Sequence, residues 1–250
     1  METILKAENI TKSYEEEGKK NLVLDHISLE IKKGEFVTVM GPSGSGKSTL
    51  LYCVSGMDTI DSGTITLKDA VISNYTEPEM AAIRRKEMGF VFQQPSLLKN
   101  LSILDNVILT AILDNPKDTE KITARGRALL KQTGISDLAD RDIAKVSGGQ
   151  LQRAGICRAL INTPSILFAD EPTGALNSKS AAEILQILKT INAQGTTILL
   201  VTHDAKVASE SSRVLFMKDG RFVSDRSFSH TDSHDSRLDT ITRIMRTLGI

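Results

Sequence analysis

The sequence contains no tryptophan, few other aromatic residues and little cysteine. Its 250 residues include two cysteines, Cys53 and Cys157, which both lie in apolar stretches. We interpret them as buried, reduced thiols, because free cysteine is usually buried. A disulfide framework or a cysteine metal site would need more of these residues, at other spacings.

Long hydrophobic runs and an excess of one charge are also missing. No apolar run approaches the roughly 20 residues of a membrane-spanning helix, and the N-terminus lacks the pattern of a signal peptide. Lys plus Arg and Asp plus Glu both number 31, so whole-surface attraction to nucleic acid or anionic lipid is not indicated. We therefore expect a cytosolic chain without a nucleic-acid partner, in which any role at a membrane requires a separate protein.

Short apolar segments alternate with helical patterns along most of the chain, which predicts an α/β fold with a mostly parallel sheet. A polar EEEGKK stretch predicts a hairpin-type loop between the first two strands. From about 94 to 145 helical periodicity replaces the strand pattern, which indicates an inserted helical lobe. Strands are expected at 4–11, 22–31, 36–40, 64–67, 88–92, 165–169, 196–201 and 214–217, and helices at 47–56, 76–85 and 180–192.

The last part of the chain has a different character. Residues 227–235 are polar and predict a linker. Apolar residues then recur at helical spacing from Leu238 to Leu248, which predicts an amphipathic helix. Its apolar stripe either packs on its own domain or forms a contact with a second copy or a partner.

Residues 41–48 read GPSGSGKS, between a predicted strand and a predicted helix. The glycines allow amide groups to approach phosphate oxygens, and the helix directs its positive end at the same anion. Lys47 would supply charge to the outer phosphates and Ser48 a hydroxyl ligand to Mg²⁺. The motif predicts phosphate binding, against the alternative of a flexible loop. The candidate nucleotide-binding residues here are Gly41, Pro42, Ser43, Gly44, Ser45, Gly46, Lys47, Ser48 and Thr49.

Two carboxylates and a histidine follow later strands. Asp170 ends the apolar strand SILFAD and fits a residue that holds Mg²⁺ through water, and Glu171 fits a base that polarises the attacking water. His203 follows the next strand, at the sheet edge that carries nucleotide in open α/β folds, and could hydrogen-bond the γ-phosphate. The alternative for the two carboxylates is a solvated acidic turn, and the alternative for His203 is a purely structural role.

Ser147, Gly148, Gly149 and Gln150 precede another predicted helix. Serine is a good helix N-cap, yet two glycine amides at a helix N-terminus also form an anion site. A domain with one phosphate loop does not need a second anion site, unless that site serves the nucleotide of another copy. This pattern favours a composite site in a dimer.

Taken together, these motifs resemble the nucleotide-binding subunits of the ATP-binding-cassette (ABC) family over nearly the whole chain. GPSGSGKS, Phe92-Gln93, VSGGQ, ILFADE and the THD around His203 occur in the family's order and spacing. The resemblance implies that Tyr14 stacks on adenine, against the alternative of a half-buried strand tyrosine. It also implies that Gln93 contacts Mg²⁺ and the attacking water.

The resemblance implies a P-loop ATPase fold with an N-terminal antiparallel β subdomain and an α-helical subdomain at about 95–162. The ATPase domain would span 1–226, and 227–250 would form the linker and tail helix. It further implies ATP and Mg²⁺ as ligands, a second copy and a membrane permease as partners, and a location at the inner face of the membrane. FADEPTGAL resembles the macrolide-export, lipoprotein-release and antimicrobial-peptide group, and RIMRTLGI resembles bacitracin-resistance transporters.

Two positions depart from the family pattern. Val146 stands where leucine is usual, and Asn177 replaces an aspartate that helps to link the two active sites of a dimer. Asn177 keeps the shape and a hydrogen bond but loses the charge. Two other functions are compatible with parts of this pattern: an ABC ATPase that drives transmembrane signalling, and a nucleotide-binding module without turnover, which Glu171 and His203 disfavour.

Overall fold

The computed structural model describes residues 2–16, 18–229 and 231–250. The chain divides into two compact units. The first, here called the sheet unit, comprises Met1–Met80 and Asn192–Ile250, and the second, the helical unit, comprises Ala81–Ile191. Helix α2 (Glu77–Glu87) begins in the first and continues in the second.

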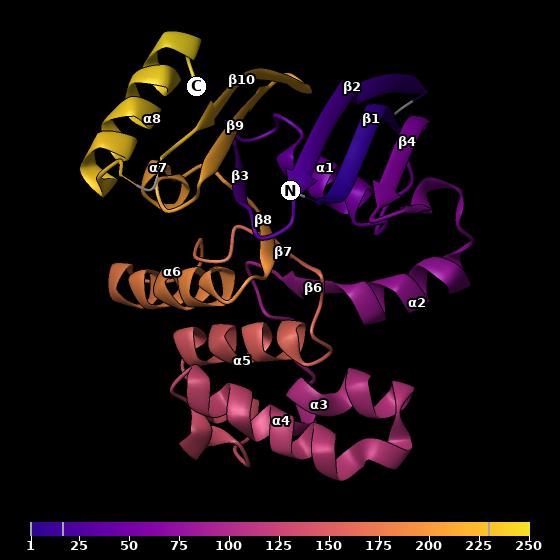
Figure 1. Cartoon of the computed structure of the whole chain (residues 1–250), viewed down its shortest axis with the longest axis vertical. Coiled ribbons are helices and arrows are strands. Elements are labelled where there is room, and N and C mark those ends of the chain that lie inside the picture. Colours follow the sequence, from indigo (N-terminus) through magenta and orange to yellow (C-terminus); the bar gives the residue numbers. More distant parts are fainter. Residues whose placement is uncertain (1, 17, 230) are drawn as a thin grey trace. The chain divides into compact units, whose positions relative to one another are not determined.

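Two sets of strands build the sheet unit (Figure 1). The first set is antiparallel and has the order β2-β1-β4-β5. In the second set β3 lies between β8 and β9 and is parallel to both, while β10 pairs antiparallel with β9. The bounds are β1 Thr3–Glu16, β2 Lys19–Lys32, β3 Phe36–Met40, β4 Ser62–Leu67, β5 Ala70–Val71, β8 Thr197–Thr202, β9 Arg213–Lys218 and β10 Arg221–Ser227.

The central strands are buried because their sequences are apolar on both faces. Every residue of β3 and of β8 is buried, which is typical of parallel strands that are covered from both sides. Helix α1 (Lys47–Val54) follows β3, helix α7 (Ala205–Ala208) follows β8, and the 3-10 turn η1 (Ile72–Asn74) follows β5. The expectation of a mostly parallel sheet with an antiparallel N-terminal β region is confirmed.

The first hairpin extends further than the sequence predicted. Strands β1 and β2 stay paired where a polar loop was expected, with Tyr14 opposite Asn21 and Glu15 opposite Lys20. Exposed charged residues are tolerated here because a solvated hairpin end needs little apolar burial. Residue 17 of the predicted loop lies outside the described residues. Strand β10 was not predicted, because its residues alternate with few apolar side chains.

The helical unit combines a parallel strand pair with a group of helices (Figure 1). Strands β6 (Met88–Val91) and β7 (Ile166–Asp170) pair in parallel. Helices follow at α3 Ile103–Asp114, α4 Thr119–Gln132, α5 Gly148–Leu160 and α6 Ser178–Ala193, with 3-10 turns η2 Pro116–Asp118, η3 Ser136–Leu138 and η4 Ile143–Lys145. The predicted helical lobe is therefore confirmed as a structural feature.

Local capping explains where several of these helices start. The Thr76 amide and hydroxyl both donate to the Glu79 carboxylate at the start of α2, a contact typical of the capping-box pattern. The Ser102 side chain accepts from the Asp105 amide at the start of α3. Each cap satisfies a backbone donor that the first helical turn leaves without a partner.

The tail helix α8 (His234–Leu248) packs on its own unit (Figure 1). Ile241 is buried in a cluster with Phe216 of β9 and Ala208 of α7, and Ile244 and Met245 pack against the same cluster. Lys218 donates to the Leu248 carbonyl at 2.8 Å and so ties the end of the helix to β9. The interpretation that the stripe packs on its own domain is confirmed. Residue 230 of the predicted linker lies outside the described residues.

The two cysteines are buried, unbridged thiols, as expected. Burial is the main cause that raises the pKa of each thiol to about 12, so neither is a reactive thiolate near neutral pH. Across residues 2–16, 18–229 and 231–250, the structure contains no helix with both the length and the apolar character that a bilayer crossing requires.

Candidate functional site

The phosphate-loop motif connects β3 to α1 as predicted. Gly44 has φ +79° and Gly46 has φ +99°, backbone angles that favour glycine strongly. Gly46 also occupies the N-cap position of α1 and, being glycine, provides no side-chain cap. The amides of the first turn therefore lack the usual serine or aspartate cap, which suits an anion at this end.

The back of this loop is held by neighbouring backbone. A Cβ on Gly41 would lie 2.1 Å from the Met217 carbonyl oxygen, and one on Gly46 would lie 2.8 Å from the Val23 carbonyl oxygen. The Gly220 amide donates to the Ser45 carbonyl at 3.1 Å. Glycine is thus required here by close packing as well as by backbone angle.

Lys47 lies across the loop that precedes it. Its ammonium group donates to the Pro42 carbonyl at 2.8 Å, and the residue is 6% exposed. A nearly buried ammonium group at the end of a glycine-rich turn places a strong positive charge beside the helix N-terminus. This arrangement fits the electrostatic role predicted for Lys47.

Tyr14 presents an aromatic ring beside the same loop. The residue is 38% exposed, and its hydroxyl donates to Asp58 Oδ2 at 2.6 Å. Burial and the hydrogen bond to Asp58 raise the pKa of the phenol to about 12, against a smaller lowering by a hydrogen bond with Thr49 of α1. The contact with Thr49 connects the ring to the segment that follows the phosphate loop.

His203 leaves the sheet next to the phosphate loop. Strands β3 and β8 are parallel, and Met40 pairs with Thr202. Gly41 and His203 are therefore the next residues at the same carboxyl edge, where open α/β sheets bind their ligands. His203 is exposed. Within the sheet unit, the structure thus places His203 at the same sheet edge as the phosphate loop, and Tyr14 near Thr49 of α1.

The helical unit brings a second set of candidates together. Strands β6 and β7 are parallel, with Val91 opposite Ala169, so Gln93 and Glu171 follow their strands at the same edge. A Cβ added to Gly174 would lie 2.8 Å from Gln93 Nε2 and 3.3 Å from Glu171 Oε2. The Gln93 amide and the Glu171 carboxylate therefore converge on one spot.

Glu171 has an unusual backbone conformation. Its φ is +42°, in the left-handed region that costs a residue with a side chain roughly 1 kcal/mol or more. The Gly174 amide donates to the Glu171 carbonyl at 3.0 Å and stabilises the turn. Such strain is often kept where it points a side chain toward a function. Asp170, the residue before, is the half-buried last residue of β7.

The SGGQ segment forms a complete capping box at the start of α5. The Ser147 hydroxyl accepts from the Gln150 amide at 3.4 Å, and the Ser147 amide donates to Gln150 Oε1 at 2.9 Å. The helix-cap interpretation is therefore confirmed. Gly148 and Gly149 occupy the first turn of α5, and their role as an anion site for a second copy stays a prediction.

Asn177 caps another helix. Its Oδ1 accepts from the Ser180 amide at 2.9 Å, at the start of α6. Asn177, at the position where the family usually has aspartate, therefore has a local structural role as the cap of α6.

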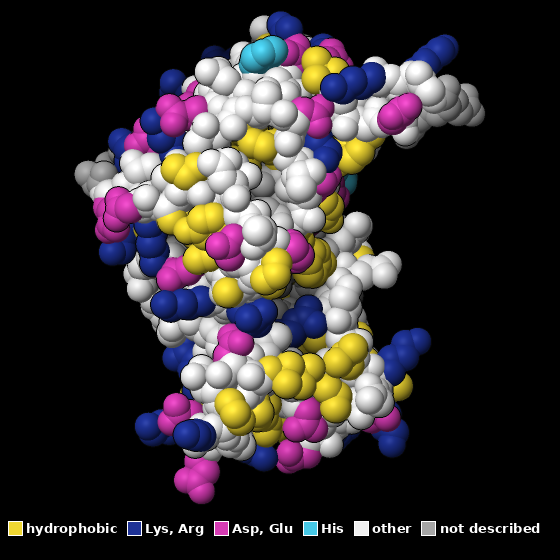
Figure 2. Space-filling model, turned by 90° about the vertical axis from the view of Figure 1, so that its right-hand side faces the viewer, with side chains coloured by type: hydrophobic (Ala, Val, Ile, Leu, Met, Phe, Trp, Pro, Cys, Tyr) yellow, Lys and Arg dark blue, Asp and Glu magenta, His cyan; other side chains and the backbone are white. Residues whose placement is uncertain are grey.

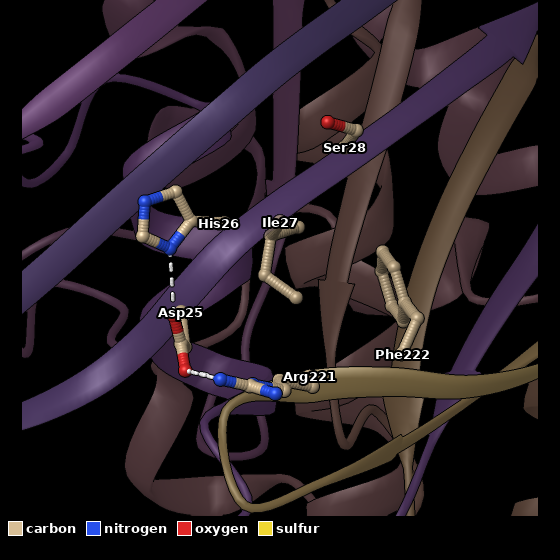
Figure 3. Close-up of a pocket in the computed structure, with 6 residues that line it drawn as sticks. All are labelled: Asp25, His26, Ile27, Ser28, Arg221 and Phe222. Atoms are coloured by element: carbon tan, nitrogen blue, oxygen red, sulfur yellow. Dashed lines mark hydrogen bonds and ion pairs between the residues drawn. The ribbon is translucent and has the colours of Figure 1, made fainter.

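A separate hollow of about 490 Å³ lies in the sheet unit between β2 and the start of β10 (Figure 3). It is lined by Asp25, His26, Ile27, Ser28, Arg221 and Phe222. Hydrogen bonds from His26 and Arg221 lower the pKa of Asp25. The charged side chains pair with one another, and the hollow is distinct from the phosphate loop and from Tyr14.

Sequence reasoning missed Lys12, Asp58, Gln152 and Arg158. Gln152 of α5 donates to the Phe92 carbonyl at 2.8 Å, and Arg158 donates to the Pro95 carbonyl at 2.7 Å. Both side chains hold the segment around Gln93 against the helix that follows the SGGQ cap. The signal in the sequence was weak, because a polar residue on an expected helix is usually solvated.

Comparison with known proteins gives a consistent result. Residues 24–174 match the family model described as ABC transporter. The chain is 40% identical over 256 residues to the bacitracin export ATP-binding protein BceA of Halalkalibacterium halodurans, covering 99% of this chain and 96% of that protein. It is 39% identical over 236 residues to the macrolide export ATP-binding/permease protein MacB of Burkholderia pseudomallei, covering 94% of this chain and 36% of that protein. The chain thus spans about a third of MacB.

A solved structure shows the same architecture. The ATP-binding cassette MJ0796, in a dimeric post-hydrolysis state bound to ADP and Pi, superposes with a TM-score of 0.84 at 37% identity. The superposition covers 90% of this chain and 99% of that chain.

Proposed function

Because this chain belongs to the ABC transporter family, we propose that it is the ATP-hydrolysing subunit of an exporter, working as a dimer with a membrane permease. The observation that carries the proposal is the phosphate loop itself. It has left-handed glycines, a nearly buried lysine and a helix whose N-cap residue is glycine. The similarity to an export ATP-binding protein supports the role in export. The similarity to the dimeric, ADP-bound cassette MJ0796 supports the dimer and the nucleotide.

Each nucleotide is held between two copies in this proposal. Residues 41–48 and Tyr14 of one copy bind the triphosphate and the adenine ring, and the Gly148 and Gly149 amides of the other copy bind the γ-phosphate. The γ-phosphate then joins the copies, so ATP favours the closed dimer and hydrolysis releases it. ATP needs only a higher affinity for the closed than for the open state to shift that equilibrium.

Glu171 is the general base in this mechanism. Its carboxylate accepts a proton from the attacking water, and the Gln93 amide beside it orients that water. His203, at the carboxyl edge of β8, hydrogen-bonds the γ-phosphate. Lys47 stabilises the charge that develops on the outer phosphates.

The proposed Mg²⁺ ligands are Ser48, Gln93 and Asp170. They offer a hydroxyl, an amide oxygen and a carboxylate, which are the hard oxygen donors that Mg²⁺ prefers. The donor chemistry of the residues therefore fits the ion. When bound, Mg²⁺ neutralises charge on the phosphates and holds them in place.

A membrane permease is the proposed partner of the helical unit, at the inner face of the membrane. Apolar side chains gather over the helices at the lower end of the view in Figure 2. Leu98 is 48% exposed and Leu113 is 71% exposed. We assign 95–162 as the helical subdomain that passes motion to the permease, 1–226 as the ATPase domain and 227–250 as linker and tail helix. The similarity to BceA supports a role in resistance to antimicrobial peptides.

Glu171→Gln tests the mechanism most directly. The amide cannot act as a base, so the rate of ATP hydrolysis should fall roughly 100- to 10,000-fold. ATP binding should persist, and the protein should elute as a stable dimer with ATP in size-exclusion chromatography with light scattering. Glu120→Gln, at an exposed position in the first turn of α4, is the matched control and should behave as wild type. Wild-type turnover in Glu171→Gln would remove Glu171 from its role, and monomers in the presence of ATP would contradict the composite site.

A further inference from the structure

Two residues outside the family motifs hold the ring of Tyr14. Asp58, just after α1, accepts the Tyr14 hydroxyl at Oδ2 (2.6 Å) and the Lys12 ammonium at Oδ1 (2.7 Å). Lys12 also lies over the Tyr14 ring, 5.0 Å from its centroid. The carboxylate thus connects two side chains of strand β1 to the segment that follows the phosphate-loop helix.

Lys12 makes this arrangement rigid. It is 6% exposed, and its ammonium group also donates to the Thr59 carbonyl at 2.7 Å. The Thr59 amide donates to Asp58 Oδ1 at 2.7 Å. A nearly buried ammonium group that is paired in this way cannot move without losing its charge partner. Asp58 is therefore fixed before it receives the hydroxyl of Tyr14.

The protonation state of Asp58 supports the same interpretation. Burial acts to raise the pKa of Asp58, but hydrogen bonds from Lys12 and Tyr14 outweigh it and lower the pKa. The carboxylate therefore stays ionised near neutral pH and remains a strong acceptor for the phenol hydroxyl. One end of Tyr14 is fixed by Asp58, and one face lies near Lys12.

An exposed aromatic side chain normally loses conformational freedom when a ligand stacks on it. That loss costs affinity, and a ring that is already held in place avoids it. Tyr14 is partly exposed and contacts Thr49 at the end of the phosphate-binding segment. It is therefore placed to meet the base of a nucleotide whose phosphates lie on the loop.

We propose that Asp58, held by Lys12, is a positioning residue that orients the Tyr14 ring for the purine base and so sets affinity for the base, leaving affinity for the phosphates unaffected. The inference rests on the proposed nucleotide site. The competing explanation is that Lys12 and Asp58 only tie β1 to the segment after α1, in which case nucleotide and inorganic phosphate ligands would be affected alike.

Tyr14→Phe provides the cleanest test, because it keeps the ring and removes only the hydroxyl. The probes are ADP and inorganic pyrophosphate, measured by calorimetry, since neither carries the γ-phosphate that joins the two copies in the proposed mechanism. ADP affinity should fall roughly two- to tenfold, and pyrophosphate affinity should stay at the wild-type value. Tyr75→Phe, at another partly exposed tyrosine, is the matched control and should change neither affinity.

Asp58→Asn extends the test to a double-mutant cycle. It should weaken ADP binding in the same range, and the Tyr14→Phe/Asp58→Asn double variant should lose no more than the larger single effect. Wild-type ADP affinity in Tyr14→Phe would overturn the proposal, as would an equal loss for ADP and pyrophosphate in Asp58→Asn. If Asp58→Asn does not fold, because Lys12 loses its charge partner, Tyr14→Phe alone decides.

The two proposals fail in different ways. A wild-type chain that binds neither ADP nor pyrophosphate overturns the proposed function and this inference together. A wild-type chain that binds both, with unchanged ADP affinity in Tyr14→Phe, overturns the positioning role alone.

Discussion

The chain has two glycine-containing helix starts that look alike in sequence and differ in structure. At α1, Gly46 is the N-cap in a left-handed conformation and, being glycine, provides no side-chain cap. At α5, Ser147 and Gln150 form a complete capping box around the glycines. The N-cap residue of α1 therefore offers no side-chain acceptor to its helix, whereas the N-cap residue of α5 does.

In the proposed composite site, this difference indicates which half binds the anion first. A helix end without a side-chain cap gains most when an anion binds, because the anion meets both the amides and the dipole. A capped end gains less. We expect each copy to load its nucleotide on the α1 side, and the α5 side of the second copy to add to an anion that is already bound.

Among the substitutions that test this difference, Gly46→Ala should have the largest effect, which is a loss of nucleotide affinity. The added Cβ would lie 2.8 Å from the Val23 carbonyl oxygen, at φ +99°. The loop must therefore shift, and nucleotide affinity of the single chain should fall at least about 100-fold, which corresponds to roughly 2.7 kcal/mol. Equilibrium dialysis with ADP measures it, and circular dichroism checks that the fold persists. Near-wild-type affinity would show that the left-handed turn is not needed.

Gly148→Ala changes the start of α5. It should weaken the ATP-dependent dimer and leave nucleotide binding by the single chain unchanged. A Cβ there would lie 3.8 Å from Cδ2 of Leu176, which is an ordinary van der Waals contact. Alanine suits the first turn of a helix, so the free energy of unfolding should stay equal or rise by up to about 1 kcal/mol.

ADP affinity of the single Gly148→Ala chain should remain unchanged, because α1 carries that site. The ATP-dependent dimer, measured in the Glu171→Gln background, should weaken about tenfold as the methyl group crowds the γ-phosphate. A dimer as strong as that of Glu171→Gln alone would remove Gly148 from the interface.

Asn177→Asp should have the smallest effect and concerns a third helix start, that of α6. Aspartate keeps the cap that Asn177 provides to Ser180 and adds a charge at the positive end of the helix. The gain in stability should be roughly 0.3–1 kcal/mol. An N-cap aspartate has a lowered pKa when folded, so the gain should be present above pH about 4 and disappear as the pH falls below it. Chemical denaturation at pH 7 and pH 3 measures it, and an equal gain at both values would contradict the charge explanation.

Much of the candidate site could be predicted from the sequence because its motifs are local. GPSGSGKS specifies a strand, a turn and a helix within a few residues, and the turn has the left-handed glycines that the motif needs. The Thr76 and Ser147 caps were likewise local patterns. Strand β10 and the extended hairpin could not be predicted, since pairing with a neighbouring strand decides them more than their own weak periodicity does.

The sequence by itself determined the phosphate loop, the alternation of strands and helices along most of the chain, and the family to which the chain belongs. Tertiary structure alone decided that Lys12 and Asp58 hold Tyr14, that Gln93 meets Glu171 beside Gly174, and that α8 covers Phe216. The physical reason is distance along the chain: a motif acts through neighbouring residues, whereas these contacts join segments that are brought together only when the strands pair and the core is buried.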